Sequence, residues 1–358
     1  MKDADKIKSP LGRQLLAWYK RNQRSLPWRK TNDPYRIWIS EIMLQQTQVD
    51  TVIPYYHRFL KAFPTVSSLA RAPLQKVLKV WENLGYYSRA GNIHDAAKVI
   101  VEKFGGQIPD KWEEIKSLPG IGLYTAGAIL SIAYGHPLPA VDGNVRRILC
   151  RLFAIRKSMD NTREQKQLQK LAASLIPAKH PGDFNQAMMD LGATICKAKN
   201  PDCSRCPVAG LCRARLHNLQ NVLPITQKTP AIPHRQAAAA VIPNSKGMLL
   251  IIQRPASGLL ASLWKLPGGF IKSGEDTESS LRRSVKKELG ISIRPGKHLA
   301  SVNHTYTHFR ITLQAYECRL LKGTPKPLGC QNWRWASLID LKKLPLPKID
   351  RMILKSIL

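Results

Sequence analysis

Four cysteines near the middle of the chain restrict its fold more than any other sequence feature. Cys196, Cys203, Cys206 and Cys212 fall within 17 residues in the pattern C-x6-C-x2-C-x5-C. A loop this compact can surround a single metal centre, and four thiolates are the usual ligands of a [4Fe–4S] cluster. A zinc ribbon more often has two CxxC pairs separated by about 15–20 residues, whereas this chain has one pair, so zinc is the less favoured alternative.

The charge balance indicates a polyanionic partner. The chain has 56 Lys and Arg against 24 Asp and Glu, a formal net charge of +32, and packing requires no such excess. Aromatic and apolar residues occur at the levels of a folded protein, which excludes a disordered basic tail. We therefore expect nucleic acid as the partner, with a merely basic surface as the alternative. Basic residues also decorate the cysteine loop: Lys197, Lys199, Arg205, Arg213 and Arg215.

The sequence predicts a protein of a reducing compartment that does not enter a membrane. Its seven cysteines are odd in number and four are clustered, which argues against a disulfide framework. No stretch approaches the roughly 20 apolar residues of a membrane span, and the first thirty residues carry charges where a signal peptide would be apolar. We expect a cytoplasmic protein.

Length and periodicity predict two domains. The 358 residues exceed one ordinary core. From Ser9 to about Arg215 apolar residues recur at three- and four-residue steps, as in helices. Later runs such as FRITLQAYECRL alternate as strands do, around a helical segment near 276–289. We expect an all-α domain over 1–217, a linker over 218–235 and an α+β domain over 236–358.

A glycine turn joins two predicted helices in WEEIKSLPGIGLYTAGAILSIA. Gly120 and Gly122 allow a tight turn whose backbone N–H groups, at the start of the second helix, can bind a DNA phosphate. Farther along, Asp142 precedes a helix that carries Arg146 and Arg147. Asp142 can be a functional carboxylate or only the N-cap of that helix, and spacing alone favours the cap.

Glu41 is the more informative carboxylate, because it lies on the apolar face of the helix that follows Pro34. A carboxyl group there is partly desolvated, which raises its pKa and suits it to donate a proton near neutral pH. Its neighbours at three- and four-residue steps are Ile37, Trp38, Leu44 and Gln45.

Two further groups of side chains can contact bases. Gln46 belongs to a run of amides that can hydrogen-bond base edges, and Tyr86 and Tyr87 can stack or wedge. Either group can equally be an ordinary polar surface or packed aromatics.

Together these motifs resemble the helix-hairpin-helix DNA glycosylases of the endonuclease III superfamily. LPGIG, VDGNV, SEIMLQQTQV and the cysteine loop match in order and spacing over about residues 10–215. Within the superfamily, WISEIMLQQTQV, GLGYYSRAGN and FNQAMMDLGA resemble the MutY family of adenine glycosylases. The resemblance implies a bacterial, nucleoid-associated monomer with a [4Fe–4S] cluster. It would act in base excision repair on double-stranded DNA, flip out adenine mispaired with 8-oxoguanine or guanine, and so prevent G:C to T:A transversions.

The resemblance also implies roles for individual residues. Glu41 would protonate adenine at N7 and then handle the attacking water, and Asp142 would stabilise the oxocarbenium-like sugar. Tyr124 and Asn144 would support the water and the sugar. The adenine pocket and the 8-oxoguanine wedge would be formed by Trp28, Arg29 and Gln186 and by Gln46 and Tyr86, respectively.

Tyr124 separates base removal from strand cleavage. In bifunctional relatives the hairpin continues with a lysine that forms a Schiff base with the sugar. The segment LPGIGLYTAG has Tyr124 at that position, and tyrosine cannot form that adduct. We therefore expect a monofunctional glycosylase.

The second domain resembles the Nudix-like domain that recognises 8-oxoguanine in the MutY family. Ser284 and Lys287 stand where the Nudix box has glutamates that hold a divalent metal, so we expect a catalytically degenerate domain without pyrophosphohydrolase activity. HTYTHF carries the match to the lesion-reading motif, with Tyr306, Thr307 and His308 in place of the more usual Phe-Ser-His. The rest of the box aligns through Gly269, Glu275, Arg283, Val285, Glu288, Gly290 and Ile291.

Three rival functions are each compatible with some of these motifs. They are a bifunctional endonuclease III-type enzyme, a nucleotide-pool hydrolase, and a non-enzymatic DNA-binding protein that senses through its cluster. Tyr124 and the second domain argue against the first, and the degraded Nudix box against the second. The third leaves Glu41 and Asp142 without a role.

Overall fold

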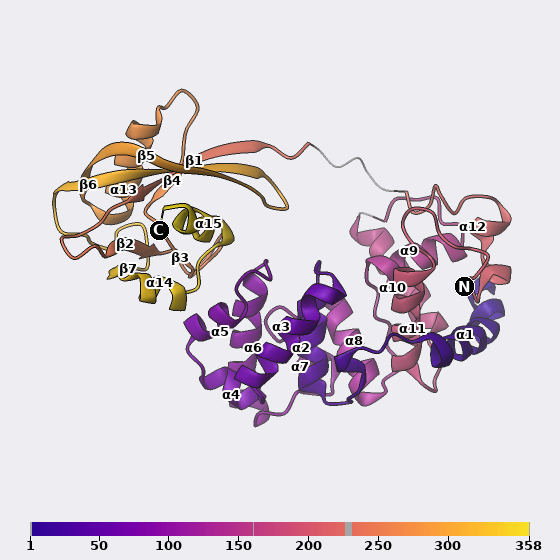
Figure 1. The fold of residues 1–358 in the computed structure, drawn as a ribbon. Helices are drawn as coiled ribbons and strands as arrows, with labels where there is room; N and C mark the ends of the chain where they lie inside the picture. Colours follow the sequence, from indigo (N-terminus) through magenta and orange to yellow (C-terminus); the bar gives the residue numbers. More distant parts are fainter. Residues whose placement is uncertain (1, 160, 226–230, 358) are drawn as a thin grey trace. The chain divides into compact units, whose positions relative to one another are not determined.

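The computed structural model describes residues 2–159, 161–225 and 231–357, and these form two compact units (Figure 1). The first unit comprises Met1–Ala70 and Asp95–Thr229, and the second comprises Arg71–His94 and Pro230–Leu358. The sequence gives no reason to group residues 71–94 with the C-terminal part. The boundaries 1–217, 218–235 and 236–358 stay a prediction, and residues 226–230 of the expected linker lie outside the described residues.

Helices build the first unit, as the apolar periodicity predicts up to Arg215. The hairpin is formed by α7 (Trp112–Lys116) and α8 (Leu123–Tyr134), and α6 (Ser88–Phe104) begins in the residues of the second unit. The other helical elements are α1 (Lys2–Asn22), η1 (Pro27–Arg29), α2 (Pro34–Leu44), α3 (Val49–Ala62), α4 (Val66–Arg71), α9 (Gly143–Leu152), α10 (Thr162–Leu175), α11 (Pro181–Thr194), η2 (Ala209–Leu211) and α12 (Arg213–Leu216).

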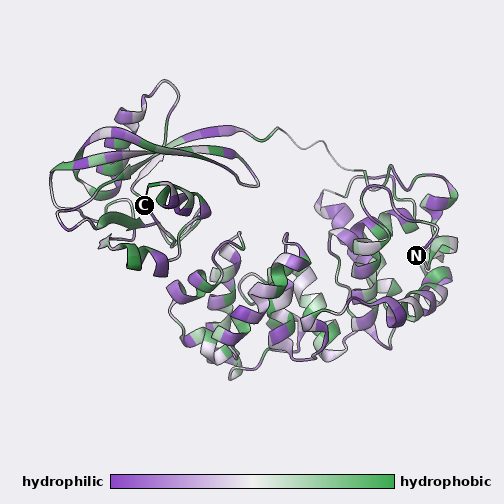
Figure 2. Ribbon diagram, viewed as in Figure 1, coloured by the Kyte–Doolittle hydropathy of each residue, from purple (hydrophilic) through white to green (hydrophobic). Residues whose placement is uncertain are grey.

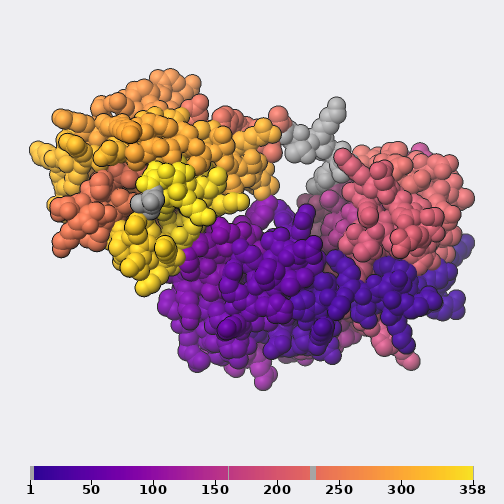
Figure 3. All heavy atoms as spheres, in the orientation of Figure 1, coloured from indigo at the N-terminus to yellow at the C-terminus, as the bar shows by residue number. Residues whose placement is uncertain are grey.

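One hydrophobic core joins the N-terminal helix of the first unit to its later helices. Leu11 and Leu15 of α1 pack with Ile148 of α9 and Leu191 of α11, although these helices are far apart in the sequence. The N-terminal helix, indigo, accordingly lies against the later helices, rose, in Figure 3. Val208 of the cysteine loop is buried in the same core. The loop is therefore packed onto the helices around it.

Two β-sheets and their covering helices build most of the second unit. A four-stranded sheet has the order β4-β1-β6-β5, in which β1 and β6 run parallel, and a three-stranded sheet has the order β3-β2-β7. The strands are β1 (His234–Val241), β2 (Leu249–Gln253), β3 (Trp264–Lys265), β4 (Gly268–Phe270), β5 (Ser292–Thr305), β6 (Arg310–Lys322) and β7 (Asn332–Ala336). The helices are α5 (Leu74–Val80), α13 (Thr277–Leu289), α14 (Leu338–Lys343) and α15 (Lys348–Ile357).

Strand β1 is buried on both faces because helices cover both sides of its sheet. Ala237 and Ala239 face a core that includes residues of α15, whereas Ala238 and Ala240 face one that includes residues of α13. Burial on both faces explains the unbroken apolar run AAAAVI. A strand with one exposed face would instead alternate between apolar and polar residues. Strand β2 has a similar apolar run, LLII, which the hydropathy colouring in Figure 2 shows in green.

None of the helices in the described part of the chain is both long enough and apolar enough to cross a membrane.

Candidate active site

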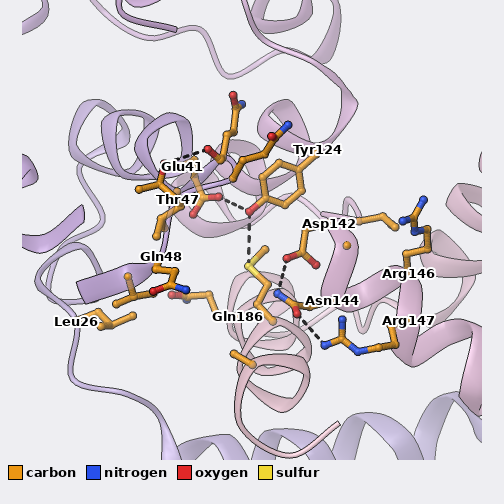
Figure 4. Close-up of a pocket in the computed structure, with 18 of the residues that line it drawn as sticks. Leu26, Glu41, Thr47, Gln48, Tyr124, Asp142, Asn144, Arg146, Arg147 and Gln186 are labelled. Carbon is orange, nitrogen blue, oxygen red and sulfur yellow. Dashed lines mark hydrogen bonds between the residues drawn. The ribbon is translucent and has the colours of Figure 1, made fainter. Parts of the chain in front are cut away.

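An open pocket of about 1250 Å³ in the first unit collects all of the expected catalytic and adenine-pocket residues (Figure 4). It lies among η1, α2, α3, α8, α9, α10 and α11, so six separate stretches of sequence supply its walls. The expected residues that line it are Trp28, Arg29, Glu41, Gln46, Tyr124, Asp142, Asn144 and Gln186.

Glu41 is the buried acid of this pocket. Helix α2 is capped by Asp33, whose side chain accepts a hydrogen bond from the Tyr35 amide, and has Pro34 in its first turn. Glu41 lies one turn after Ile37 on the buried face of this helix. Only 4% of Glu41 is exposed, so the sequence prediction of burial is confirmed. Burial raises the pKa of its carboxyl group to about 7, and the nearby Asp142 charge adds to the rise. Near neutral pH the group can therefore hold a proton and release it.

Tyr124 holds the Glu41 carboxyl group in place. Its hydroxyl donates a hydrogen bond to Glu41 Oε2 at 2.5 Å and lies 3.8 Å from Met189 Sδ (Figure 4). Burial and the Glu41 charge raise the pKa of the Tyr124 phenol well above 10, so the phenol stays a donor. The residue at the expected lysine position thus contacts the buried acid directly.

Asp142 is both an N-cap and a pocket residue. Its Oδ1 accepts the Val145 amide at 2.7 Å at the start of α9, and its Oδ2 accepts Asn144 Nδ2 at 2.9 Å. Burial raises the pKa of the carboxyl group, while these hydrogen bonds and the Arg147 charge oppose the rise. The two readings of Asp142 are therefore compatible, because the capping hydrogen bonds also orient the carboxylate.

Arg147 connects this carboxylate to the cysteine loop. Its Nη2 donates to Asn144 Oδ1 at 2.8 Å and to the Gly192 carbonyl at 2.7 Å, and its Nε donates to the Cys196 carbonyl at 2.7 Å. A continuous chain of hydrogen bonds thus runs from Asp142 through Asn144 to the backbone of Cys196. The sequence marks Arg147 only as a basic residue of the helix.

Asp190 is a buried carboxylate that sequence reasoning missed. Its two oxygens accept Arg29 Nη1 at 2.5 Å and Nη2 at 2.8 Å, and Oδ1 also accepts Arg24 Nε at 2.7 Å. Although burial opposes it, hydrogen bonding to Arg29 and the two guanidinium charges hold the pKa of Asp190 below its usual range. Asp190 thereby fixes Arg29 in the pocket wall. The signal for it was a single acid among the apolar residues of FNQAMMDLGA, the same signal that identified Glu41.

The four cysteines line one cavity, and none of them is in a disulfide. No three His, Cys, Asp or Glu side chains among the described residues converge on a position for a single metal ion. Arg151 of α9, only 2% exposed, donates to Cys196 Sγ at 3.2 Å and to the carbonyls of Lys197 and Ala198 at 2.7 and 3.1 Å. A thiolate centre with a buried cation as hydrogen-bond donor fits an anionic metal–sulfur cluster.

The glycines of the hairpin differ in why they are needed. Gly120 has φ +76°, a left-handed conformation that favours glycine. Gly122 has φ −92° in extended backbone, and no atom lies within 4 Å of the position a Cβ would take. A positive φ thus requires glycine at Gly120, whereas Gly122 is the N-cap of α8 without a capping side chain.

Gln46 and Tyr86 share an uncommon backbone. Gln46 has φ +55° and Tyr86 has φ +47°, and both side chains are exposed. Non-glycine residues in this region are strained, and such strain gathers at functional sites. Tyr87, the other tyrosine of the GLGYYSR run, is 7% exposed and so is packed.

The Tyr306-Thr307-His308 motif forms the tip of the hairpin between β5 and β6. Tyr306 is half-buried, and its ring packs against the core of the second unit, 5.1 Å from the ring of Phe309. Thr307 and His308 are exposed. Within the second unit, Thr307 Oγ1 and the Tyr86 hydroxyl form a hydrogen bond of 2.5 Å. The structure thus pairs two expected base-contacting residues that lie 221 positions apart.

The carboxylates of the Nudix-like box are engaged with cations of the chain itself. Glu288 pairs with Lys265 at 2.9 Å and accepts the Gly268 amide, and Glu275 pairs with Arg283 at 2.6 Å. Ser284 is buried with its hydroxyl close to Gly269, and Lys287 is exposed. Neither of the latter two supplies a carboxylate, in agreement with the reading of the sequence.

Three parts of the chain match described protein families. Residues 39–174 match the HhH-GPD superfamily of base excision DNA repair proteins, and residues 238–356 match the NUDIX domain. Residues 196–212 match the iron–sulfur binding domain of endonuclease III, which decides between the iron–sulfur cluster and zinc. The cofactor of the chain is a [4Fe–4S] cluster, and the fold is a helix-hairpin-helix glycosylase domain followed by a Nudix-like domain.

Relatives and solved structures agree with these matches. The chain is 38% identical to the adenine DNA glycosylase of Rattus norvegicus, over 90% of this chain and 73% of the relative. It is 36% identical to that of Buchnera aphidicola (strain APS), over 96% of both chains. A thermostable thymine-DNA glycosylase superposes with a TM-score of 0.54 at 30% identity, over 60% of this chain and 98% of that one. A trapped endonuclease III–DNA covalent intermediate gives 0.52 at 25% identity, over 60% and 98%.

Identity at this level extends over both the helical part and the Nudix-like part of the chain. The pocket with its buried acid, the iron–sulfur loop and the sequence relationship point the same way, and the chain belongs to the adenine DNA glycosylase family.

Proposed function

We propose that the chain hydrolyses the N-glycosidic bond of adenine opposite 8-oxoguanine, and also opposite guanine, and so prevents G:C to T:A transversions. The observation that carries this proposal is Glu41, a carboxyl group buried in an open pocket with a pKa raised to about 7. Such a group can give a proton to a poor leaving group near neutral pH, which adenine requires. Asp142, from a different helix, provides a second carboxylate in the same pocket.

The proposed chemistry uses the two carboxyl groups differently. Glu41 donates its proton to N7 of adenine, the bond from C1′ to the base breaks, and the electron pair leaves with the base. Asp142, held by the Val145 amide and Asn144, stabilises the positive sugar. Water then adds to C1′ and returns a proton to the Glu41 carboxylate. Tyr124 keeps that carboxylate oriented throughout.

The pocket is suited to a base that has left the duplex. Adenine must be flipped out, because its reacting atoms are stacked inside the helix. Trp28 offers a buried aromatic wall, and Gln186 and the fixed guanidinium of Arg29 offer hydrogen bonds. Amide groups at the start of α8, after Gly120 and Gly122, would bind a backbone phosphate.

Reading of 8-oxoguanine is assigned to exposed residues. Gln46 and Tyr86, both in left-handed backbone, would wedge beside the lesion, and Thr307 would offer its hydroxyl to the lesion edge. The hydrogen bond between Tyr86 and Thr307 supports this assignment, because it joins the side chains of two residues that are assigned to the same lesion. His308, exposed on the same tip, would contribute a further polar contact.

The four cysteines are assigned as the cluster ligands. When bound, the cluster would order the backbone of residues 196–212 and keep its exposed basic side chains ready for DNA phosphates. Arg151 and Arg147 would hold this loop to α9 through the Cys196 sulfur and carbonyl.

Single-turnover release of adenine tests the proposed function. Duplexes with adenine opposite 8-oxoguanine, guanine or thymine are compared, and the first should react fastest. Glu41→Gln and Asp142→Asn should each lose release, whereas Glu102→Gln, which changes an exposed glutamate of α6, should not. Absence of release from the 8-oxoguanine duplex, or full activity of Glu41→Gln, would overturn the proposal.

The boundaries 1–217, 218–235 and 236–358 and a monomeric state belong to the same proposal. Limited proteolysis should cut first within 218–235, and light scattering should give a mass near 40.2 kDa.

A further inference from the structure

Residues 71–94 are fastened to the rest of the second unit by a cluster of polar side chains. Glu82 is at its centre. Its Oε1 accepts hydrogen bonds from Arg351 Nε at 2.7 Å and from the Leu346 amide at 3.0 Å, and its Oε2 accepts Lys79 Nζ at 2.6 Å. The Glu82 side chain is only 11% exposed and that of Arg351 21%. This ion pair is therefore largely shielded from solvent.

A second contact fastens the same segment seven residues earlier. Gln75 of α5 accepts Trp264 Nε1 at 3.0 Å and donates to the Ser262 carbonyl at 2.9 Å, so both ends of its amide are used. Lys79 Nζ lies 3.3 Å from the Leu344 carbonyl. Together with Glu82, these contacts join α5 and the turn after it to β3 and to the residues before α15. We call Gln75, Lys79, Glu82, Trp264 and Arg351 the anchor.

Glu82 of the anchor lies four residues before Tyr86, the first member of the proposed reading pair. The pair itself is a single hydrogen bond between two exposed hydroxyl groups. Water competes for such a bond, so the bond alone cannot keep Tyr86 and Thr307 together. The shielded, charge-assisted contacts of Glu82 are the stronger ones, because ionised partners strengthen hydrogen bonds and burial reduces screening.

We infer that Glu82 is a positioning residue. Through Arg351 and the Leu346 amide, it fixes residues 71–94 to the rest of the second unit. It thereby keeps Tyr86 and Thr307 paired as one reader of the base opposite adenine. The inference rests on the proposed reading of 8-oxoguanine. Glu82 is not among the residues that line the adenine pocket, so it acts on partner discrimination and not on bond cleavage.

Glu82→Gln tests the inference, because it keeps the size of the side chain and removes its charge. Single-turnover adenine release is measured on duplexes with adenine opposite 8-oxoguanine and opposite guanine. The rate on 8-oxoguanine should fall about tenfold, the effect of losing one charge-assisted hydrogen bond, and the rate on guanine should change less than about twofold. Glu278→Gln, which breaks an exposed pair with Arg282 on α13, is the matched control and should change neither.

Two further measurements separate positioning from general stability. Arg351→Lys keeps the charge but cannot reproduce the contacts of the guanidinium, and combined with Glu82→Gln it should add little further loss. Hydrogen exchange of the Leu346 amide should quicken in Glu82→Gln, whereas amides in the centre of β6 should keep their rates. Should Glu82→Gln fold poorly, Arg351→Lys is judged by the same ratio of rates.

The outcomes distinguish the inference from the function on which it rests. If the chain without substitutions released adenine equally fast from both duplexes, the proposed recognition of 8-oxoguanine itself would be overturned. A chain that prefers 8-oxoguanine, with Glu82→Gln retaining that preference, would overturn the inference alone. Equal losses on both duplexes would show a general structural role and would overturn it as well.

Discussion

Replacing Tyr124 with phenylalanine should move the alkaline limb of the pH–rate profile of adenine release to higher pH. The phenol donates a hydrogen bond to Glu41, and this favours the carboxylate form. Burial has the larger and opposite effect, and the net pKa of Glu41 is about 7. Phenylalanine keeps the ring but removes the donor, so burial acts with less opposition and the pKa rises further.

The size of the shift follows from the strength of one hydrogen bond. A bond to a charged group contributes about 1.5–3 kcal/mol, and one pKa unit corresponds to about 1.4 kcal/mol. The pKa of Glu41 should therefore rise by about one to two units. At pH 8 about a tenth of Glu41 is protonated in the unchanged chain, against about half or more in the variant. Relative to its plateau, the rate at pH 8 should rise about fivefold or more.

The assay is single-turnover release of adenine, with the protein in excess, over a pH series that covers both limbs. Each rate is divided by the plateau rate of the same variant, because the lost hydroxyl can slow the reaction in other ways. Any residual release by Glu41→Gln should lack this alkaline limb. A limb at the same pH in Tyr124→Phe and in the unchanged chain would refute the assignment of Glu41 as the titrating acid.

Four further predictions follow from the geometry. The pKa of Glu41 rises from 4.5 to about 7 on folding. The contribution of Glu41 to the free energy of unfolding is therefore fully present below pH 4.5 and is lost as the pH rises through 7. Glu41→Gln should therefore be more stable than the unchanged chain at pH 8, by about 3 kcal/mol at about 1.4 kcal/mol per unit, and nearly equal at pH 4; equal urea midpoints at pH 8 would contradict this. Borohydride should trap little covalent adduct on adenine:8-oxoguanine DNA, and efficient capture would contradict monofunctionality. The chain with Mg²⁺ should not hydrolyse 8-oxo-dGTP, because Glu288 is paired with Lys265; measurable release of pyrophosphate would show otherwise. The unchanged chain should show the visible absorbance of the cluster and contain about four iron atoms per chain, and Arg151→Met should lose both. Arg205→Met, at an exposed position of the loop, should retain both.

Part of this site could be predicted from local sequence patterns. The spacing of the four cysteines indicated one compact centre, and apolar neighbours at helical steps placed Glu41 in the interior, where it lies. Asp142 before a helix indicated an N-cap, and the structure shows that cap. These predictions concern residues within one or two turns of each other, where backbone periodicity alone determines which side chains share a face.

Some predictions were limited because the same patterns do not give backbone angles or depth. Two glycines in a turn do not reveal which one has a positive φ, and only Gly120 does. Tyr306 follows an alternating strand, but its place at a hairpin tip lets its ring pack against Phe309, so it is half-buried.

By itself, then, the sequence determined the four-cysteine loop, the buried acid and the order of helical and mixed domains. Only the tertiary structure decided which side chains these residues contact. Tyr124 binds Glu41 across 83 residues, Asp190 holds Arg29 across 161, and Tyr86 meets Thr307 across 221. Helical and strand periods specify a face but not the side chain that it meets, because that choice depends on how separate elements pack. For the same reason the grouping of residues 71–94 with the second unit, and with it the anchor at Glu82, is a property of the folded chain.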